Sequence, residues 1–97
     1  MRAEFAVIVD ADMRKPTVFR TFDLNNNIGL SNLISSRHMK VTDVVQHVDD
    51  ADVDIICSGP VPPNPSELLN SNRMNEIISE LEEHYDLILF DMPPVVS

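Results

Sequence analysis

The feature that most constrains this chain is a short apolar run that ends abruptly in charge. Phe5–Val9 has no polar side chain, and Asp10–Arg14 follows it with two aspartates and an arginine. Nothing in the run repeats every three or four residues, so it is typical of a strand covered on both faces. A second apolar run, Leu87–Phe90, also ends in an aspartate, Asp91. Two parallel strands of this kind would bring two carboxylates to one sheet edge, where open α/β folds bind ligands.

Two further segments have a clear pattern. Asp54–Ser58 is a short apolar run that predicts a third strand. A brief helix is predicted at Ser66–Leu69, after a stretch with four prolines that can join neither a sheet nor a helix. Ser71 then precedes apolar residues at helical spacing, which predicts a longer helix capped by this serine. The apolar face of that helix would consist of Met74, Ile77, Ile78, Leu81 and Tyr85.

The other helical segments are short and less regular. Pro16 suits the first position of a brief helix, because its missing N–H costs nothing there. Gly29–Ile34 predicts another helical turn, with Ser31 as its cap. Thr42 is predicted to cap a helix that reaches Val48, although valine is a poor helix former.

The order of these elements predicts the fold class. Strand, helix, strand, helix, strand implies right-handed crossovers and a parallel sheet in an α/β domain. Only three strands are recognisable, and two of them are apolar at every position, which calls for helices on both faces. The predicted helices are too few to cover both faces. We therefore expect residues 1–97 to form one partial domain that further chain or a partner completes.

Charge excludes some classes of partner. Seven basic and sixteen acidic side chains give a net charge of -9, the wrong sign for wrapping nucleic acid or lying on anionic lipid. The charge is uneven, since residues 1–40 carry six basic and four acidic side chains and residues 41–97 carry one and twelve. We therefore expect no nucleic-acid partner, and local positive charge beside the corner at residues 10–14.

Compartment follows from what the sequence lacks. The single cysteine, Cys57, excludes an internal disulfide and is typical of a small apolar residue in a buried strand. No run approaches the roughly 18 apolar residues of a membrane span, and the first four residues lack the apolar core of a signal peptide. The chain as given is expected to be soluble and cytoplasmic.

The strand ends carry the chemistry that the sequence predicts. Asp10 and Asp91 are oxygen ligands suited to Mg²⁺, which takes one or two protein carboxylates and leaves its other positions to water and phosphate. Asp12 could touch the metal shell or accept a proton, and Arg14 could meet phosphate oxygens or a carboxylate of a neighbouring chain. Alone, Asp10 and Asp12 are more typical of a turn than of a site, and Asp91 shifts the interpretation toward a site. The phosphate-binding sequence G-x-x-x-x-G-K-[ST] is absent from the chain.

Four segments together resemble one family. Val7–Pro16 resembles the second nucleotide motif, called Walker A-prime, of the bacterial tyrosine kinases of capsular and exopolysaccharide synthesis. These kinases are a branch of the P-loop ATPases, related to the septum-positioning and plasmid-partition ATPases. Gly29–Ser31 resembles a loop of the family, and Leu87–Pro94 resembles its Walker B segment. Gly59–Leu69 is the most specific match, because the aspartate motifs alone indicate only the wider superfamily.

The resemblance implies a fold and a set of site residues. Residues 1–97 would be a single partial kinase domain, from Walker A-prime to Walker B, within a three-layer P-loop ATPase fold. ATP and Mg²⁺ would be the cofactors. Asp10 and Asp12 would be catalytic, Asp10 and Asp91 would hold the metal, and Arg14 with Asp91 would bind the nucleotide. Met92 stands where the family usually has threonine, so any hydroxyl contact there is lost.

The resemblance also implies an activity and partners. The parent chain would transfer the γ-phosphate of ATP to tyrosines of protein substrates, including neighbouring subunits, and would regulate polysaccharide synthesis. It would be a homo-oligomer held at the inner face of the membrane by an activator protein of polysaccharide export. The phosphate-binding half should precede Phe5, and another strand, further helices and a tyrosine-rich tail should follow Ser97. We expect the 97 residues alone to be inactive.

Three other interpretations remain open on the sequence. The chain could belong to a partner-controlled ATPase of the same superfamily that is not a kinase. It could be a non-catalytic remnant that binds the partners of the parent kinase. It could also be a phospho-accepting receiver domain with Asp91 as the acceptor, although Asp10 and Asp91 lie 81 residues apart, which is too far for that fold.

Overall fold

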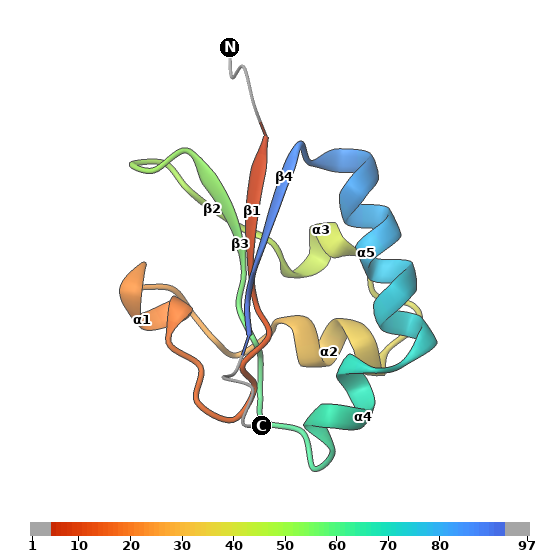
Figure 1. Cartoon of the computed structure of the whole chain (residues 1–97). Coiled ribbons are helices and arrows are strands. Elements are labelled where there is room, and N and C mark those ends of the chain that lie inside the picture. Colours follow the sequence, from red (N-terminus) through yellow and green to blue (C-terminus); the bar gives the residue numbers. More distant parts are fainter. Residues whose placement is uncertain (1–4, 93–97) are drawn as a thin grey trace.

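A four-stranded sheet lies at the centre of the chain, and helices pack on both of its faces (Figure 1). The computed structural model describes residues 5–92. The strands are β1 (Ala6–Asp10), β2 (Gln46–Val48), β3 (Val53–Ile56) and β4 (Leu87–Asp91), in the spatial order β2-β3-β1-β4. Strand β1 pairs in parallel with both β3 and β4, while β2 pairs antiparallel with β3. The predicted α/β fold with a parallel sheet is therefore confirmed for three strands.

The helices are divided unequally between the two faces of the sheet. Helix α1 (Val18–Thr21) lies on one face, while α2 (Leu30–Ser35), α3 (Val41–Val44), α4 (Pro65–Leu69) and α5 (Asn72–His84) lie on the other (Figure 1). The predicted N-cap of α5 is confirmed, because Ser71 Oγ accepts a hydrogen bond from the N–H of Met74. The unequal division leaves one face with a single helical turn over it.

Side chains alternate along β1 between two apolar clusters, as they must in a strand. Val7 and Val9 are fully buried on the α2 and α5 side, against residues such as Ile77. Ala6 and Ile8 face the smaller cluster around Val18 of α1. The core is therefore larger on the side that carries four helices.

One predicted helix is wrong over half of its length. The helix capped by Thr42 was expected to reach Val48, but α3 ends at Val44 and Gln46–Val48 forms β2. Strand β2 then turns back through an exposed hairpin and pairs with β3, His47 opposite Asp54. Burying Val41 and Val44 stabilises a single helical turn, and the β-branched residues after it favour a strand.

Three predicted helix starts are displaced. Thr42 is not a cap, because Lys40 is the N-cap of α3 and Thr42 is its second helical residue. Pro16 is not the first helical residue, because Thr17 is the N-cap and α1 begins at Val18. Ser31 is not a cap either, since Gly29 is the N-cap of α2 and Ser31 is the second helical residue. The hydroxyl of Ser31 instead donates to the carbonyl oxygen of Pro60 at 2.7 Å. The serine therefore ties α2 to the loop after β3.

Strand β4 is the least covered element of the sheet. It has β1 on one side and no strand neighbour on the other among residues 5–92. Leu87 and Leu89 are exposed on the face that α1 only partly covers. The expectation that the helices are too few for the sheet is therefore confirmed at this edge. The prediction that Pro93 and Pro94 end this strand lies outside the described residues.

No helix within residues 5–92 is long and apolar enough to cross a membrane.

Candidate functional site

The ends of β1 and β4 bring two aspartates together. Asp10 and Asp91 are register partners in the parallel pair, and neighbouring strands lie about 4.8 Å apart. The N–H of Ala11 donates to the carbonyl oxygen of Asp91 at 2.9 Å, which extends the ladder past the last paired residues. Because register partners point to the same face, both carboxylates lie on the α1 side of the sheet. The predicted meeting of two carboxylates at one edge is confirmed.

Asp10 is fully buried, which is unusual for a carboxylate. Its Oδ1 accepts a hydrogen bond from the N–H of Asp12 at 3.1 Å, and its Oδ2 accepts one from the N–H of Val18 at 3.2 Å. Burial raises the pKa of Asp10 above its ordinary value of 3.8, and the charge of Asp91 adds to the rise, while the backbone donors oppose it. Burial of this carboxyl group therefore opposes its charged form, while the two backbone N–H groups favour it.

Asp12 and Arg14 lie in the bend that follows β1. Asp12 is half-buried, and its Oδ1 accepts a hydrogen bond from the N–H of Lys15 at 3.1 Å. Arg14 and Lys15 are exposed. Asp12 therefore shapes the bend, as the turn interpretation predicted, while the cationic side chains of Arg14 and Lys15 are exposed to solvent.

The loop that follows β3 is held at the same edge by hydrogen bonds from amide and hydroxyl side chains. Asn26 contacts both backbone groups of Gly59: its Oδ1 accepts from the N–H at 2.8 Å, and its Nδ2 donates to the carbonyl oxygen at 3.2 Å. The backbone N–H of Ser31 donates to the carbonyl oxygen of Ser58 at 2.9 Å. Gly59 has a φ of 82°, in the region that favours glycine. These contacts lock the start of α2 against the end of β3.

Sequence reasoning missed this fastening. The run Asn25–Asn27 was interpreted only as a turn, and Ser31 only as a cap. A signal was present, since asparagines next to glycine and serine are the residues that bond to nearby backbone groups. Their partners lie some 30 residues away in the sequence, however, so no local pattern could identify them.

Cys57 follows β3 directly and is fully buried in the apolar cluster on the α1 side of the sheet. Burial raises the pKa of its thiol from 9.0 to about 11, and the negative charge of Asp10 makes a smaller contribution to this rise. A thiol of this kind is a poor nucleophile and a poor metal ligand near neutral pH. The prediction that Cys57 is a buried apolar residue is confirmed.

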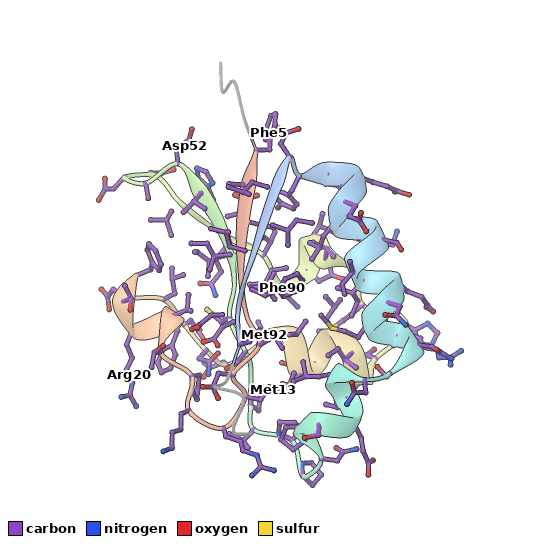
Figure 2. All side chains as sticks on the ribbon, in the orientation of Figure 1. Phe5, Met13, Arg20, Asp52, Phe90 and Met92 are labelled. Carbon is purple, nitrogen blue, oxygen red and sulfur yellow. The ribbon has the colours of Figure 1, made fainter. Side chains whose placement is uncertain are left out.

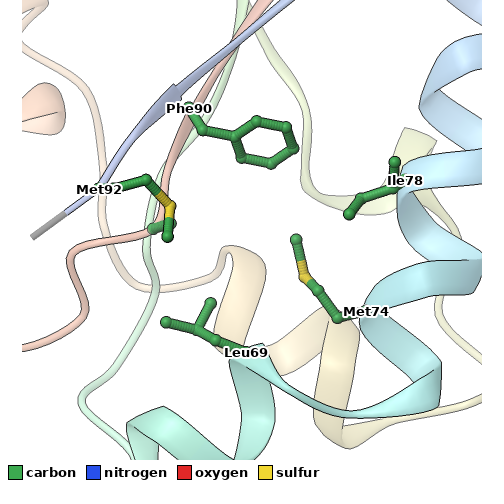
Figure 3. Close-up of a pocket in the computed structure, with 6 residues that line it drawn as sticks. Leu69, Met74, Ile78, Phe90 and Met92 are labelled. Carbon is green, nitrogen blue, oxygen red and sulfur yellow. The ribbon is translucent and has the colours of Figure 1, made fainter.

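An open apolar pocket of about 290 Å³ borders the edge on the other face of the sheet (Figure 3). Side chains from β4, α4 and α5 converge on it, and carbon and sulfur atoms make up most of its wall. It is lined by Ala11, Leu69, Met74, Ile78, Phe90 and Met92. Nothing in this lining could bind a phosphate.

The donor set at the edge fits a magnesium ion better than a transition metal. No group of three or more His, Cys, Asp or Glu residues within residues 5–92 is arranged to hold a metal. Asp10 and Asp91 supply hard oxygen ligands, and each Asp10 oxygen keeps a lone pair besides the one that accepts an N–H. Asp10 and Asp91 are register partners, so their negative charges repel each other, and a bound cation would relieve that repulsion. Mg²⁺ suits such a pair because it leaves most of its positions to water and phosphate.

Comparisons with known sequences give a consistent result. No protein-family model matches the chain. CapB of Staphylococcus aureus is 45% identical over 89 residues, which are 92% of this chain and 39% of CapB. The tyrosine-protein kinase YwqD of Bacillus subtilis (strain 168) is 40% identical over 91 residues, 94% of this chain and 38% of YwqD. The chain thus spans about two fifths of the length of these relatives.

Solved structures agree with the sequence relatives. The chimerical protein CapA2B2 matches with a TM-score of 0.90 and 39% identity, over 98% of this chain and 42% of that one. The kinase domain of Escherichia coli tyrosine kinase ETK matches with a TM-score of 0.87 and 36% identity, over 94% of this chain and 35% of that one. MinD of Pyrococcus horikoshii, solved with Mg-ADP, matches with a TM-score of 0.70 and 22% identity, which shows the fold alone.

Proposed function

The chain belongs to the family of bacterial tyrosine-protein kinases, of which it matches one segment, and we propose that it is the magnesium-binding part of such a kinase. The whole protein transfers the γ-phosphate of ATP to tyrosine and regulates capsular or exopolysaccharide synthesis. The 97 residues alone do not catalyse this transfer, because they contain no G-x-x-x-x-G-K-[ST] loop for the phosphates.

Each site residue has a role in this proposal. Asp10 and Asp91 hold Mg²⁺ together with phosphate oxygens, and Arg14 contacts the phosphates. The buried Asp10 accepts the proton of the incoming tyrosine hydroxyl, helped by Asp12 in the bend. The raised pKa of Asp10 supports this role, because a carboxylate with a higher pKa is a better base. When bound, Mg²⁺ neutralises charge that develops on the transferred phosphoryl group.

The observation that carries the proposal is the register of β1 and β4. It sets Asp10 directly opposite Asp91 at the carboxyl ends of two parallel strands. This is the edge at which open α/β sheets bind their ligands. A structural explanation of Asp10 as a turn residue accounts for its two backbone hydrogen bonds, but not for a second carboxylate in register with it.

The proposal extends to partners on the strength of the family resemblance. The substrates are tyrosines of protein chains, including those of neighbouring subunits in a homo-oligomer. A membrane activator protein of polysaccharide export holds the kinase at the cytoplasmic face of the membrane.

The test places the chain in an intact relative. The matched 91-residue segment of YwqD is replaced by its counterpart from this chain, and ATP-dependent tyrosine phosphorylation is measured with Mg²⁺. We expect the chimera to be active. We expect Asp10→Asn or Asp91→Asn to lower its rate by about 100-fold or more, since preorganised charge supplies most of the rate in phosphoryl transfer.

The matched control is Asp49→Asn, which removes one carboxylate from the exposed hairpin between β2 and β3. This variant should keep the rate of the chimera within about twofold. A folded chimera that binds ATP without phosphorylating tyrosine would refute the proposal, and so would an Asp10→Asn variant with full activity.

A further inference from the structure

The hairpin formed by β2 and β3 carries one histidine among several aspartates. Figure 2 shows Asp52 on this hairpin, at the opposite end of the sheet from Met13 in the bend after β1. Residues 46–54 include four aspartates and neither lysine nor arginine. His47 is therefore the one side chain of this segment that can carry a positive charge.

Both ring nitrogens of His47 face carboxylates. Nδ1 lies 2.6 Å from Oδ1 of Asp54. Nε2 lies 3.5 Å from Oδ1 of Asp49 and 3.5 Å from Oδ1 of Asp52. The side chain of His47 is 41% exposed, so the ring can exchange protons with solvent.

These contacts suit the protonated ring better than the neutral one. A neutral imidazole has one N–H and one lone pair, whereas an imidazolium donates from both nitrogens. If the neutral ring carries its proton on Nδ1, the lone pair of Nε2 faces Asp49 and Asp52. If the proton is on Nε2 instead, the lone pair of Nδ1 faces Asp54 at 2.6 Å. Only the imidazolium makes attractive contacts on both sides.

The two aspartates that face Nε2 form the turn of the hairpin. The N–H of Asp52 donates to the carbonyl oxygen of Asp49 at 3.2 Å. Asp52 has a φ of 49°, which lies in the left-handed region that side chains other than glycine adopt infrequently. A charged His47 therefore holds the strained part of the hairpin.

Asp54 connects these contacts to the rest of the fold. It lies opposite His47 in the β2–β3 ladder, and its side chain is 17% exposed. Its Oδ2 accepts a hydrogen bond from the hydroxyl of Tyr85, the C-cap of α5, at 2.5 Å. Asp54 is thus held from two sides, whereas the side chains of Asp49 and Asp52 project from the turn and are 97% and 57% exposed.

We propose that the β2–β3 hairpin is a proton-sensitive clasp, in which protonated His47 holds Asp49 and Asp52 of the turn to Asp54 of β3. Histidine is the side chain whose charge ordinarily changes between about pH 5 and pH 8. The clasp is closed at the acidic end of this range. It opens toward the basic end, because the ring loses its N–H toward the turn.

A proton is the cation that this hairpin can take up. No group of three or more His, Cys, Asp or Glu residues within the described part of the chain is arranged to hold a metal ion. The clasp lies at the end of the sheet away from the carboxylate pair, and nothing in it depends on ATP, Mg²⁺ or the proposed kinase activity.

The test measures backbone amide hydrogen exchange in the hairpin of the 97-residue chain at about pH 5.5 and about pH 7.5. Each rate is compared with that of an unstructured chain at the same pH, which gives a protection factor. The readout is the ratio of the two protection factors for residues 46–54. We expect this ratio to be about threefold or more larger in the parent chain than in His47→Gln, because exposed ion pairs contribute on this scale. Both proteins keep Asp10, so its titration affects them equally.

The two other histidines provide matched controls. His38 and His84 are both exposed, and His38→Gln and His84→Gln should keep the ratio of the parent chain. A second kind of variant removes the acceptors and leaves the histidine in place. The double substitution Asp49→Asn and Asp52→Asn should lower the ratio toward that of His47→Gln, because only neutral acceptors remain in the turn.

Tyr85 reports on the fixed part of the clasp. It is the only tyrosine in a chain without tryptophan, so its fluorescence is the intrinsic signal of the protein. We expect the same emission at both pH values, because its hydrogen bond to Asp54 does not depend on the charge of His47.

Several outcomes would overturn the proposal. Equal ratios in the parent chain and His47→Gln would show that this histidine does not control the hairpin. Loss of the effect in His38→Gln or His84→Gln would place the titrating group elsewhere. An unchanged ratio in the double asparagine variant would show that the turn is not held by its carboxylates. All of these readouts are independent of nucleotide and of activity.

Discussion

At the scale of single residues, Asp10 shows a conflict between stability and chemistry. Its carboxylate is fully buried and lies in register with a second carboxylate, and its pKa is raised chiefly by desolvation. A core selected for stability alone would hold an apolar or neutral side chain there. Two backbone hydrogen bonds keep the side chain in place at this cost. Such a conflict is the usual mark of a functional position.

The raised pKa of Asp10 predicts how stability depends on pH. Because the folded chain holds this proton more tightly than the unfolded chain, ionisation destabilises the fold as pH rises above 3.8. The loss grows by up to about 1.4 kcal/mol per pH unit and stops at the raised folded pKa. The variant Asp10→Asn lacks this loss, so its stability relative to the parent chain should rise over that window and then level off. Urea unfolding of both proteins from about pH 3 to pH 8 measures the difference.

What tests the raised pKa is how the difference in unfolding free energy between Asp10→Asn and the parent chain changes with pH. The size of that difference at any single pH does not test it. The amide of Asn can replace only one of the two oxygens that accept backbone N–H groups, so the variant loses a constant amount of stability at every pH. A difference between the two proteins that stays flat or falls as pH rises would contradict the raised pKa of Asp10.

At the scale of elements, the contact between the start of α2 and the end of β3 leaves no room for a side chain. A Cβ atom on Gly29 would lie 2.1 Å from the carbonyl oxygen of Cys57 and 2.6 Å from the nitrogen of Gly59. Both atoms belong to the backbone, so neither can swing away. We expect Gly29→Ala to lower the free energy of unfolding by about 1–3 kcal/mol or more, as measured in urea. Ser35→Ala, at an exposed position in the same helix, should change it by less than about 0.5 kcal/mol.

The cap of α5 offers a second prediction at this scale. Ser71 Oγ accepts from the N–H of Met74 at 3.2 Å and donates to the carbonyl oxygen of Leu68 at 2.6 Å, so it joins α5 to α4. Ser71→Ala should cost about 1 kcal/mol in urea unfolding, because the N–H of Met74 loses its acceptor, whereas the carbonyl oxygen of Leu68 keeps the backbone N–H of Ser71. Ser79→Ala, exposed on the same helix, should be close to neutral. Equal effects of the two substitutions would show that the cap contributes nothing.

The elements that sequence could predict are those whose pattern is local. Side-chain patterns predict the apolar strands β1, β3 and β4. They also predict the apolar face of α5, which includes Met74 and Ile77. Strand β2 was missed because valines occur both in α3 and in the residues after it. Their spacing does not show where the helical turn ends and the strand begins, which tertiary packing decides. Ser31 was misplaced because its hydroxyl is satisfied by Pro60, 29 residues away. The pairing of Asp10 with Asp91 was predictable because both residues follow apolar runs. The burial of Asp10 was not predictable, because its carboxylate is held by the N–H of Val18, eight residues further along the chain.

At the scale of the whole molecule, negative charge dominates. The net charge of -9 opposes compaction, and the paired carboxylates at the sheet edge add to the repulsion. Any salt should relieve part of this repulsion by screening. A cation that binds between Asp10 and Asp91 should do more than screen, because it binds the folded chain and not the unfolded one.

Magnesium should therefore stabilise the chain beyond its contribution to ionic strength. If the site binds Mg²⁺ with a dissociation constant of about 1 mM, then about 10 mM Mg²⁺ adds about 1.4 kcal/mol to the free energy of unfolding, compared with NaCl of equal ionic strength. Asp91→Asn should abolish this increment, since it removes one of the two ligands, while Asp49→Asn removes an equal charge from the far hairpin and should keep it. Urea unfolding at fixed ionic strength measures all three proteins without nucleotide or activity. An increment that survives in Asp91→Asn would mean that Mg²⁺ acts on the acidic surface as a whole, and the carboxylate pair would then need the phosphates of ATP before it could hold a metal.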